Sequence, residues 1–301
     1  MRPVANRQGG DPGPFNDIIH AWHGNLAYDP ALVQVPVAII RGEWEGVIPD
    51  ADARRPAPDQ RKEDLMFAVI FEVQPKQGRF DDYLDLAKSL KPQLEAIEGF
   101  IDIDRFGSKR MKGRVLSLSI WRDEKAVVRW RAQGDHHGAQ QKGRFEIFEG
   151  YRLRVGEITA DTAPPAGTPV EQTRFDETQV GSAKVATITE VTPRHDGALD
   201  ADVLRADVGL RADADGLIGQ ETFESIYNPG KLLLLASWRD AGAASLWAPA
   251  TPAAAKAVRH RQVRILRDYG MHERREAPQF YPDVKSEKSG ADDKPKRTAA
   301  G

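Results

Sequence analysis

Two segments of this sequence repeat one another without a gap. Residues Gly99–Trp130 align with Gly216–Trp247 at a constant offset of 117, and 12 of the 32 aligned positions are identical. Two unrelated segments of this length would share about two positions, so the similarity is far above chance. The identical positions include two glycines and the run Trp-Arg-Asp, which begins at Trp121 in one segment and at Trp238 in the other. The chain is therefore expected to contain two copies of one folding unit.

The hydrophobic periodicity predicts the same order of elements in both copies. In the first copy we expect a strand at 66–73, a helix at 79–98, strands at 100–108 and 114–121, a helix from residue 123 and a strand at 148–157. In the second copy we expect a strand at 184–191, a helix at 198–211, strands at 217–227 and 231–238, a helix from residue 241 and a final segment ending near residue 274. The order β-α-β-β-α-β is that of a ferredoxin-like unit. The predicted fold class is α+β, with two tandem ferredoxin-like domains.

The third strand of the second copy is apolar on both faces. Residues Leu232–Leu235 are consecutive leucines, and alternate side chains of a strand point to opposite sides of the sheet. In a ferredoxin-like unit the helices cover only one face, so an apolar second face needs a partner. We expect the two sheets to pair as an α+β barrel, either within one chain, as an internal pseudo-dimer, or between the chains of a homodimer.

Three polar segments, rich in proline or in charge, separate the units. They are residues 49–64, 159–180 and 284–301. Segments of this composition bury too little apolar surface to offset the entropy lost on ordering. The predicted organisation is an N-terminal piece with a linker at 1–64, poorly ordered in part, a first domain at 65–158, a linker at 159–180, a second domain at 181–283 and a disordered tail at 284–301.

The composition excludes several classes of function. The chain has no cysteine, which removes disulfides, thiolate catalysis and cysteine-based metal centres. Its formal net charge of -2 gives no basic footprint for nucleic acid or for an anionic membrane. The first residues lack the apolar core of a secretory signal, and the apolar runs are too short to cross a bilayer. A cytoplasmic protein without a nucleic-acid or membrane partner is expected.

Several motifs of the first copy resemble the antibiotic biosynthesis monooxygenase family. They are Trp-Arg-Asp-Glu-Lys-Ala at 121–126 with Trp130, His-His-Gly-Ala-Gln at 136–140, Gly-Arg at 143–144 and Tyr-Arg-Leu-Arg-Val at 151–155. The resemblance covers nearly all of 65–158 and extends to 181–275 through the repeat. It implies a dimeric α+β barrel and an oxygenase that acts on a small aromatic or polyketide-like substrate with molecular oxygen and no cofactor. The family also includes heme-degrading enzymes and proteins with no known reaction.

The N-terminal piece resembles a different family. Residues Val35–Glu45 are similar to a late strand of α/β-hydrolases, whose end carries the acid of the catalytic triad, and Glu45 stands at the position of that acid. The chain contains no Gly-x-Ser-x-Gly nucleophile motif, and an acid without a nucleophile and a base cannot hydrolyse a substrate. Residues 15–54 are therefore interpreted as a remnant of an α/β-hydrolase.

Oxidation of a carbanion-forming substrate without a cofactor needs a base, hydrogen-bond donors for the developing oxyanion and a dry apolar lining. The family resemblance implies His136 as the base, with Trp130 and Tyr151 as further catalytic residues. Candidates for substrate binding in the first copy are Trp121, His137, Gln140, Arg144 and Phe71. The candidates in the second copy are Trp238, Trp247, His260 and Tyr269. No metal site is expected, because adjacent histidines lack the spacing that makes ligands converge.

Structural roles compete with these assignments. Trp121 and Trp238 recur in both copies, which also suits tryptophans that anchor the sheet to the following helix. His136 and His137 are neighbours on a predicted helix, so at most one of them faces a pocket, and a capping or surface role suits either. The basic run at 259–264 is interpreted as a solvated helix face.

Two alternative functions remain at this point. Heme degradation is the weaker one, because that branch of the family needs a histidine and an asparagine where this chain has Gln140 and Phe71. The stronger alternative is a non-catalytic or small-molecule-binding barrel with a role in stress or quality control. A closed aromatic cavity at His136 would favour the oxygenase, whereas a barrel filled by side chains would favour the binding protein.

Overall fold

The computed structural model describes residues 66–166, 170, 172–279 and 281. These residues belong to a unit that spans Asp59–Gly301. The hydrolase-like segment at 15–54, including Glu45, and the tail at 284–301 lie outside the described residues. Within the described ranges, no helix has both the length and the apolar character needed to cross a membrane.

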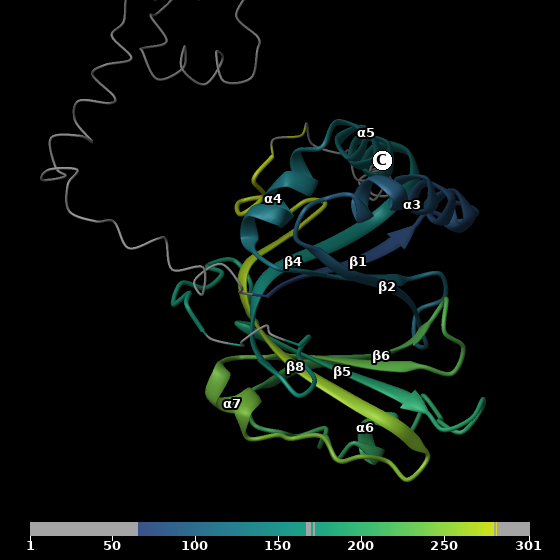
Figure 1. Ribbon diagram of the computed structural model, residues 1–301, viewed down its shortest axis with the longest axis vertical. Coiled ribbons are helices and arrows are strands. Elements are labelled where there is room, and N and C mark those ends of the chain that lie inside the picture. The colour runs from purple at the N-terminus through teal and green to yellow at the C-terminus, as the bar shows by residue number, and fades with distance from the viewer. Residues whose placement is uncertain (1–65, 167–169, 171, 280, 282–301) are drawn as a thin grey trace, which may run out of the picture. The chain divides into compact units, whose positions relative to one another are not determined.

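Eight antiparallel strands form one closed barrel, four from each copy of the repeat (Figure 1). The first copy contributes β1 (Phe67–Pro75), β2 (Phe100–Ser108), β3 (Val115–Trp121) and β4 (Phe148–Asp161). The second copy contributes β5 (Val185–Pro193), β6 (Leu217–Ser225), β7 (Leu232–Trp238) and β8 (Ala255–Gly270). Around the barrel the order is β1-β3-β2-β6-β7-β5-β8-β4. The α+β, ferredoxin-like fold class predicted from the sequence is confirmed.

Two seams join the copies, and both lie within the chain. The short seam pairs β2 with β6, from Phe106 opposite Ser225 to Ser108 opposite Phe223. The long seam pairs β4 with β8, from Arg152 opposite Gly270 at one end of the register. Of the two pairings expected for the sheets, this barrel therefore uses the internal one. Closure also pairs every strand on both sides, which removes the free edges on which β-sheets aggregate.

The interior of the barrel is packed with apolar side chains from both copies. Buried members of this cluster include Ile70, Phe106 and Leu118 from the first copy and Ile188, Phe223 and Leu235 from the second. The consecutive leucines of β7 divide as their alternation predicts. Leu233 and Leu235 join the barrel interior, whereas Leu232 and Leu234 join a second cluster on the outer face of the sheet. Because side chains fill the barrel interior, a ligand-binding site is expected on the outer face of the sheet.

Helices accompany the outer face of each half of the barrel. The first copy has α3 (Phe80–Glu95), α4 (Glu124–Ala132), α5 (Gly134–Lys142) and one turn of π-helix, η3 (Gly143–Ile147). The second copy has only α6 (Leu204–Asp207) and α7 (Ala241–Ser245). Figure 1 shows the two groups on opposite sides of the barrel. The larger helical layer of the first copy is what creates room for a cavity there.

The aspartate of each Trp-Arg-Asp run caps the helix that follows it. The Asp123 carboxylate accepts a hydrogen bond from the Ala126 backbone N–H at 2.6 Å, and the Asp240 carboxylate accepts one from Ala243 at 2.8 Å. Each bond satisfies one of the free N–H groups at a helix start. The repeated aspartate therefore sets where α4 and α7 begin.

The repeated glycine of each copy lets the same helix approach the chain closely. Gly99 has φ +90°, and a Cβ at this position would lie 2.8 Å from the Cβ of Ala126. Gly216 has φ +74°, and its Cβ would lie 2.4 Å from the Cβ of Ala243. Both positions thus require glycine for backbone conformation and for space.

The interpretation of 259–264 as a solvated helix face is wrong. This run lies in β8, where His260 and Arg261 are buried. Arg261 forms an ion pair with Glu190 on β5, which compensates the burial of its charge. Because the partner lies 71 residues away in the sequence, the local run of basic residues gave no sign of it.

The helix predicted at 198–211 is also wrong, because only α6 (Leu204–Asp207) forms there. The backbone N–H of Asp202 donates to the side chain of Asp200 at 2.9 Å, a local turn that competes with helix. Gly209, with φ +74°, ends the short helix two residues after Asp207.

Candidate functional site

A cavity of about 200 Å³ lies between the helices of the first copy and the outer face of the sheet. One wall comes from alternate positions on five strands, because side chains two residues apart on a strand point to the same face. These pairs are Val69 and Phe71, Ile103 and Arg105, Ser117 and Ser119, Leu153 and Val155, and Arg267 and Tyr269. The last pair belongs to β8, so the second copy completes a site that is otherwise built from the first copy.

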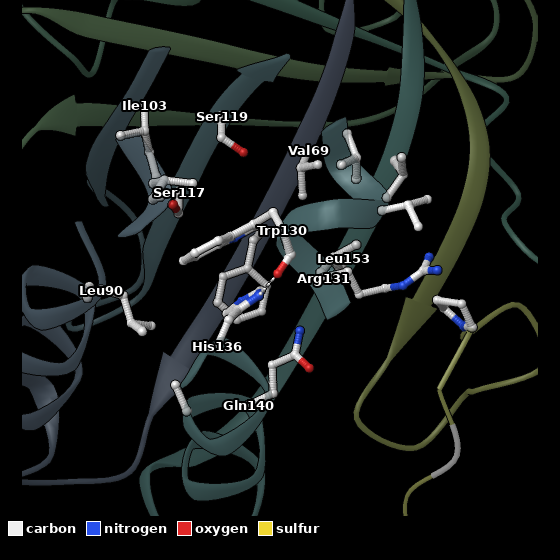
Figure 2. A pocket seen from close by; sticks show the side chains of 18 of the residues that line it. Val69, Leu90, Ile103, Ser117, Ser119, Trp130, Arg131, His136, Gln140 and Leu153 are labelled. Carbon is white, nitrogen blue, oxygen red and sulfur yellow. Dashed lines mark hydrogen bonds between the residues drawn. The ribbon is translucent and has the colours of Figure 1, made fainter. Parts of the chain in front are cut away.

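The opposite wall comes from three helices (Figure 2). Helix α3 contributes Leu90 and Leu94, which are four residues apart and therefore lie on one face of the helix. Helix α4 contributes Val127 and Trp130. Helix α5 contributes His136, Ala139 and Gln140. The lining is mostly apolar, with a small number of polar groups, as is typical of a small-molecule site.

His136 is held in one tautomer by the backbone of Trp130. Its Nδ1 lies 2.9 Å from the carbonyl oxygen of Trp130, a contact drawn as a dashed line in Figure 2. A carbonyl oxygen only accepts hydrogen bonds, so Nδ1 carries the hydrogen and Nε2 keeps its lone pair. Burial lowers the pKa of His136 to about 4, against the opposing effect of this hydrogen bond. At neutral pH, His136 is therefore a neutral imidazole that can accept a proton at Nε2.

The break between α4 and α5 positions this histidine. Gln133 has an extended backbone, with φ -67° and ψ 134°, and it separates the two helices. Its side-chain oxygen accepts a hydrogen bond from the His136 backbone N–H at 2.6 Å, which caps α5. The turn brings the His136 ring parallel to the Trp130 indole, with ring centroids 4.1 Å apart and planes 14° apart. His136 is thus fixed by a cap, a backbone hydrogen bond and a ring stack.

Tyr83 and Arg105 contribute polar groups to the cavity on the side of α3 and β2. Burial raises the pKa of the Tyr83 hydroxyl, and the nearby Arg105 charge only partly opposes this shift. The hydroxyl therefore stays protonated at neutral pH. Arg105 donates to the Tyr227 hydroxyl at 3.4 Å, while its Nε is buried without a partner among the described residues.

Five of the residues predicted for the site line the cavity. They are Phe71, Trp130, His136, Gln140 and Tyr269. Tyr151 lies behind this wall, with its ring centroid 5.6 Å from that of Phe71. The Tyr151 hydroxyl accepts a hydrogen bond from Arg274 at 2.8 Å. The structure thus places Tyr151 as a support for Phe71 and outside the lining.

Three other predicted residues of the first copy lie away from the cavity. Trp121 is fully buried in the core, where its Nε1 donates to the Ser119 hydroxyl at 2.9 Å. His137 is exposed and stacks on Tyr281, with ring centroids 5.7 Å apart. Arg144 is buried in η3 and donates to the Met271 carbonyl oxygen at 2.6 Å. Of the two adjacent histidines, only His136 faces the cavity, as helical geometry requires.

The tryptophans and the histidine predicted for the second copy do not line this cavity, and Trp238 and Trp247 instead border a smaller pocket of about 140 Å³ in their own copy. Trp238 and Trp247 stack with ring centroids 6.1 Å apart. Trp247 also packs edge-on against His260, at 5.1 Å between centroids. His260 Nδ1 lies 2.8 Å from the Thr189 hydroxyl. The second copy has no counterpart of α5, because the segment between α7 and β8 contains Pro249 and Pro252 and forms no helix.

Arg105, Arg131 and Arg267 line the cavity but were not identified from the sequence. Arg131 lies four residues after Val127 on α4, a helical spacing that would have placed both on one face. Arg267 lies two residues before Tyr269, so it shares a strand face with a residue that was identified. This spacing was not recognised because the final segment of the second copy was not interpreted as a strand.

Among residues 66–166, 170, 172–279 and 281, no group of three or more histidine, aspartate or glutamate side chains has an arrangement that could hold a metal ion. The polar groups of the cavity are hydroxyls, one imidazole, guanidinium groups, the Gln140 amide and the Glu124 carboxylate. Such groups bind and orient organic ligands and their oxygen atoms.

Comparison with known proteins places the chain in a family. The sequence profile of the antibiotic biosynthesis monooxygenases matches residues 66–142. Jasmonate monooxygenase ABM of Pyricularia oryzae is 43% identical over 222 residues, which cover 72% of this chain and 99% of that protein. Protein YqjZ of Bacillus subtilis is 27% identical over 92 residues, which cover 31% of this chain and 78% of that protein.

Among solved structures, an aldoxime dehydratase has a TM-score of 0.43 and 12% identity, over 67% of this chain and 81% of the other. The chain belongs to the antibiotic biosynthesis monooxygenase family.

Proposed function

We propose that the protein is a monooxygenase that oxidises a small, largely apolar substrate with molecular oxygen in the cavity beside His136, and that it needs no cofactor for this reaction. The observation that carries the proposal is the neutral His136, fixed with its Nδ1–H on the Trp130 carbonyl in an apolar cavity of small-molecule size. The Pyricularia relative is named for jasmonate, which is a cyclopentanone. An enolisable ketone of this kind has an acidic C–H bond beside its carbonyl group, and loss of that proton gives an electron-rich enolate that can react with O2.

The cavity supplies the groups that such a reaction needs. Nε2 of His136 accepts the proton of the activated C–H bond, because Nδ1 is already protonated. The charge that develops on the substrate oxygen needs hydrogen-bond donors, which the Trp130 indole N–H and the Tyr83 hydroxyl provide from the same cavity. The apolar side chains of Val69, Leu94 and Val155 give the carbanion a wall that offers no hydrogen bonds to water.

The overall reaction balances without an external reductant when the substrate carries an activated methylene group. One oxygen atom of O2 becomes the new carbonyl oxygen, and the other leaves as water with the two methylene hydrogens. The four electrons that O2 takes up come from the two C–H bonds that break. The proton taken by His136 in the first step is returned to the leaving oxygen.

The test is oxygen uptake with anthrone and with jasmonic acid, with no flavin, metal or heme added. We expect uptake by the wild-type protein and the incorporation of one 18O atom from labelled oxygen. His136→Ala should lower kcat/KM by about a hundredfold or more, because a positioned general base contributes at least this much. His195→Ala is the matched control, because His195 is exposed and lies on the second copy.

Two results would contradict this proposal. One is oxygen uptake that is as fast in His136→Ala as in the wild type, which would show that His136 is not the base. The other is no uptake with either substrate by folded wild-type protein, which would favour the alternative of a barrel that only binds its ligand.

A further inference from the structure

We propose that Arg131 and Arg267 form a carboxylate-binding site at one end of this cavity, and that the ligand is an apolar acid held there by its negative charge. That the acid is a substrate rests on the proposed function. That it binds at Arg131 and Arg267 does not depend on any reaction.

The two guanidinium groups reach the same cavity from different parts of the chain. Arg131 lies in the last turn of α4 and Arg267 lies on β8, and both line the cavity. Neither side chain has a hydrogen bond or an ion pair with any residue in the described part of the chain. Both residues are partly buried, so their guanidinium groups are open to a ligand in a mostly apolar cavity, where an anion would be held more strongly than at the exposed surface.

Two other arginines of the same sheet have carboxylate partners. Arg154 is buried and pairs with Glu72, and Arg152 pairs with Asp268 through two hydrogen bonds. Arg105 is buried too and lines the cavity, but its printed partner is the Tyr227 hydroxyl and not a carboxylate. Among the described residues, the three arginines that line the cavity, Arg105, Arg131 and Arg267, are thus alike in having no carboxylate partner, in contrast to Arg152 and Arg154.

The carboxylate of the cavity wall does not neutralise them. Glu124 lines the cavity, but it pairs with Arg174 at 2.5 Å. Burial lowers the pKa of Arg131, and the positive charge of Arg267 acts in the same direction. Tyr269 and Glu124 oppose this shift. A bound anion would relieve both the burial and the repulsion between the two cations.

A third donor lies beside the two arginines. Tyr269 is two residues from Arg267 on the same face of β8 and lines the cavity. Burial raises the pKa of Tyr269 to about 12, with a further contribution from Tyr151. Its hydroxyl is therefore protonated at neutral pH and can donate to a carboxylate oxygen, while guanidinium groups bind carboxylates through paired hydrogen bonds.

The anionic end and the reactive end of the cavity are separated. Trp130 and Arg131 are consecutive on α4, so their side chains point about 100° apart. Figure 2 shows Trp130 beside His136 and the Arg131 side chain extending away from them, next to Leu153. A ligand with a carboxylate at Arg131 and Arg267 would place its apolar body along Leu153 and Val155, toward His136.

The test compares acids with their neutral esters by calorimetric titration in the absence of oxygen. The probes are jasmonic acid with methyl jasmonate, and 1-naphthaleneacetic acid with its methyl ester. We expect each acid to bind the wild-type protein about tenfold more tightly than its ester, or better, because hydrogen bonds between charged groups contribute at least this factor. Arg131→Gln and Arg267→Gln should each lose most of this preference and leave ester binding unchanged.

The matched control is Arg129→Gln, which removes the same charge from α4 at an exposed position outside the cavity. It should keep the full preference for the acid. Unchanged ester binding by the two cavity variants shows that they remain folded. Equal binding of acid and ester to the wild type, a preference that survives in the double variant, or no binding of either acid would each overturn the proposal.

The outcomes also separate this site from the proposed reaction. Arginine-dependent binding of the acids without oxygen uptake would keep the anion site and refute the oxygenase. Oxidation of acid and ester at equal rates, unaffected by Arg131→Gln, would keep the oxygenase and refute the anion site.

Discussion

His136 donates a hydrogen bond from Nδ1 to the carbonyl oxygen of Trp130, the residue whose indole ring it stacks against, at an N···O distance of 2.9 Å. One neighbour thus fixes both the orientation and the tautomer of the imidazole. Burial of the ring lowers the pKa of His136 to about 4, although the hydrogen bond to Trp130 opposes this shift. The proposed base is therefore kept neutral by its burial, while Trp130 fixes its orientation and its tautomer.

The first prediction concerns the pH dependence of the proposed reaction. Because His136 must be neutral to accept a proton, kcat/KM should rise with pH through about 4 and stay level toward neutral pH. A solvated histidine would instead place this rise near its ordinary value of about 6.5. The measurement is the pH profile of kcat/KM for oxygen uptake between pH 3.5 and 8, and a midpoint near 6.5 would contradict a buried base.

The second prediction concerns stability at mildly acidic pH. Burial lowers the pKa of His136 and of His260 to about 4, whereas the unfolded chain titrates near 6.5. Between these two pKa values, the histidines bind more protons in the unfolded state than in the folded state. Their titration therefore leaves the free energy of unfolding unchanged above about pH 6.5 and lowers it as the pH falls toward 4. Each histidine contributes a slope of up to about 1.4 kcal/mol per pH unit.

Urea unfolding at pH 7, 6, 5 and 4.5 measures this slope. His136→Gln and His260→Gln should each reduce it, while His195→Gln, at an exposed position, should leave it as in the wild type. A slope that neither buried-site variant changes would show that other groups cause the acid sensitivity.

The third prediction concerns the buried ion pairs of the barrel. Glu72 pairs with Arg154, which is 1% exposed, and with Arg114 at 2.5 Å. Glu72→Gln leaves the Arg154 charge buried without its partner, so the free energy of unfolding should fall by about 3–5 kcal/mol. Glu98→Gln removes an exposed ion pair with Arg122 and should change it by less than about 0.5 kcal/mol. Similar losses in the two variants by chemical unfolding would contradict this account.

The fourth prediction concerns the repeated glycines. Gly99→Ala and Gly216→Ala each place a Cβ within 3 Å of an alanine Cβ and at a positive φ. Each should therefore destabilise the fold by about 1–3 kcal/mol. Gly138→Ala is the matched control in α5, where an added Cβ meets nothing within 4 Å, and it should stabilise the protein slightly. Thermal unfolding of the three variants measures the difference, and an unchanged Gly99→Ala would refute the steric argument.

Much of the fold was predictable because its signals are local. The alternation of Leu232–Leu235 identified a strand with two buried faces, and the Trp-Arg-Asp runs marked the ends of strands and the starts of helices. Spacing on one helix showed that only one of His136 and His137 faces a cavity. Trp130 and His136 were both predicted for the site, but the break between α4 and α5 that stacks their rings was not predicted.

Other features depend on contacts between residues far apart in the chain. The basic run at 259–264 resembles a solvated surface until β5 supplies Glu190 as the partner of Arg261. Arg267 joins the cavity only because β4 pairs with β8 and closes the barrel within the chain. Periodicity therefore predicted most of the strands and helices, because it depends on neighbours in sequence, while the family resemblance singled out His136 as the proposed base. The tertiary structure decided which charges are compensated and which face the cavity, because burial and charge pairing depend on neighbours in space.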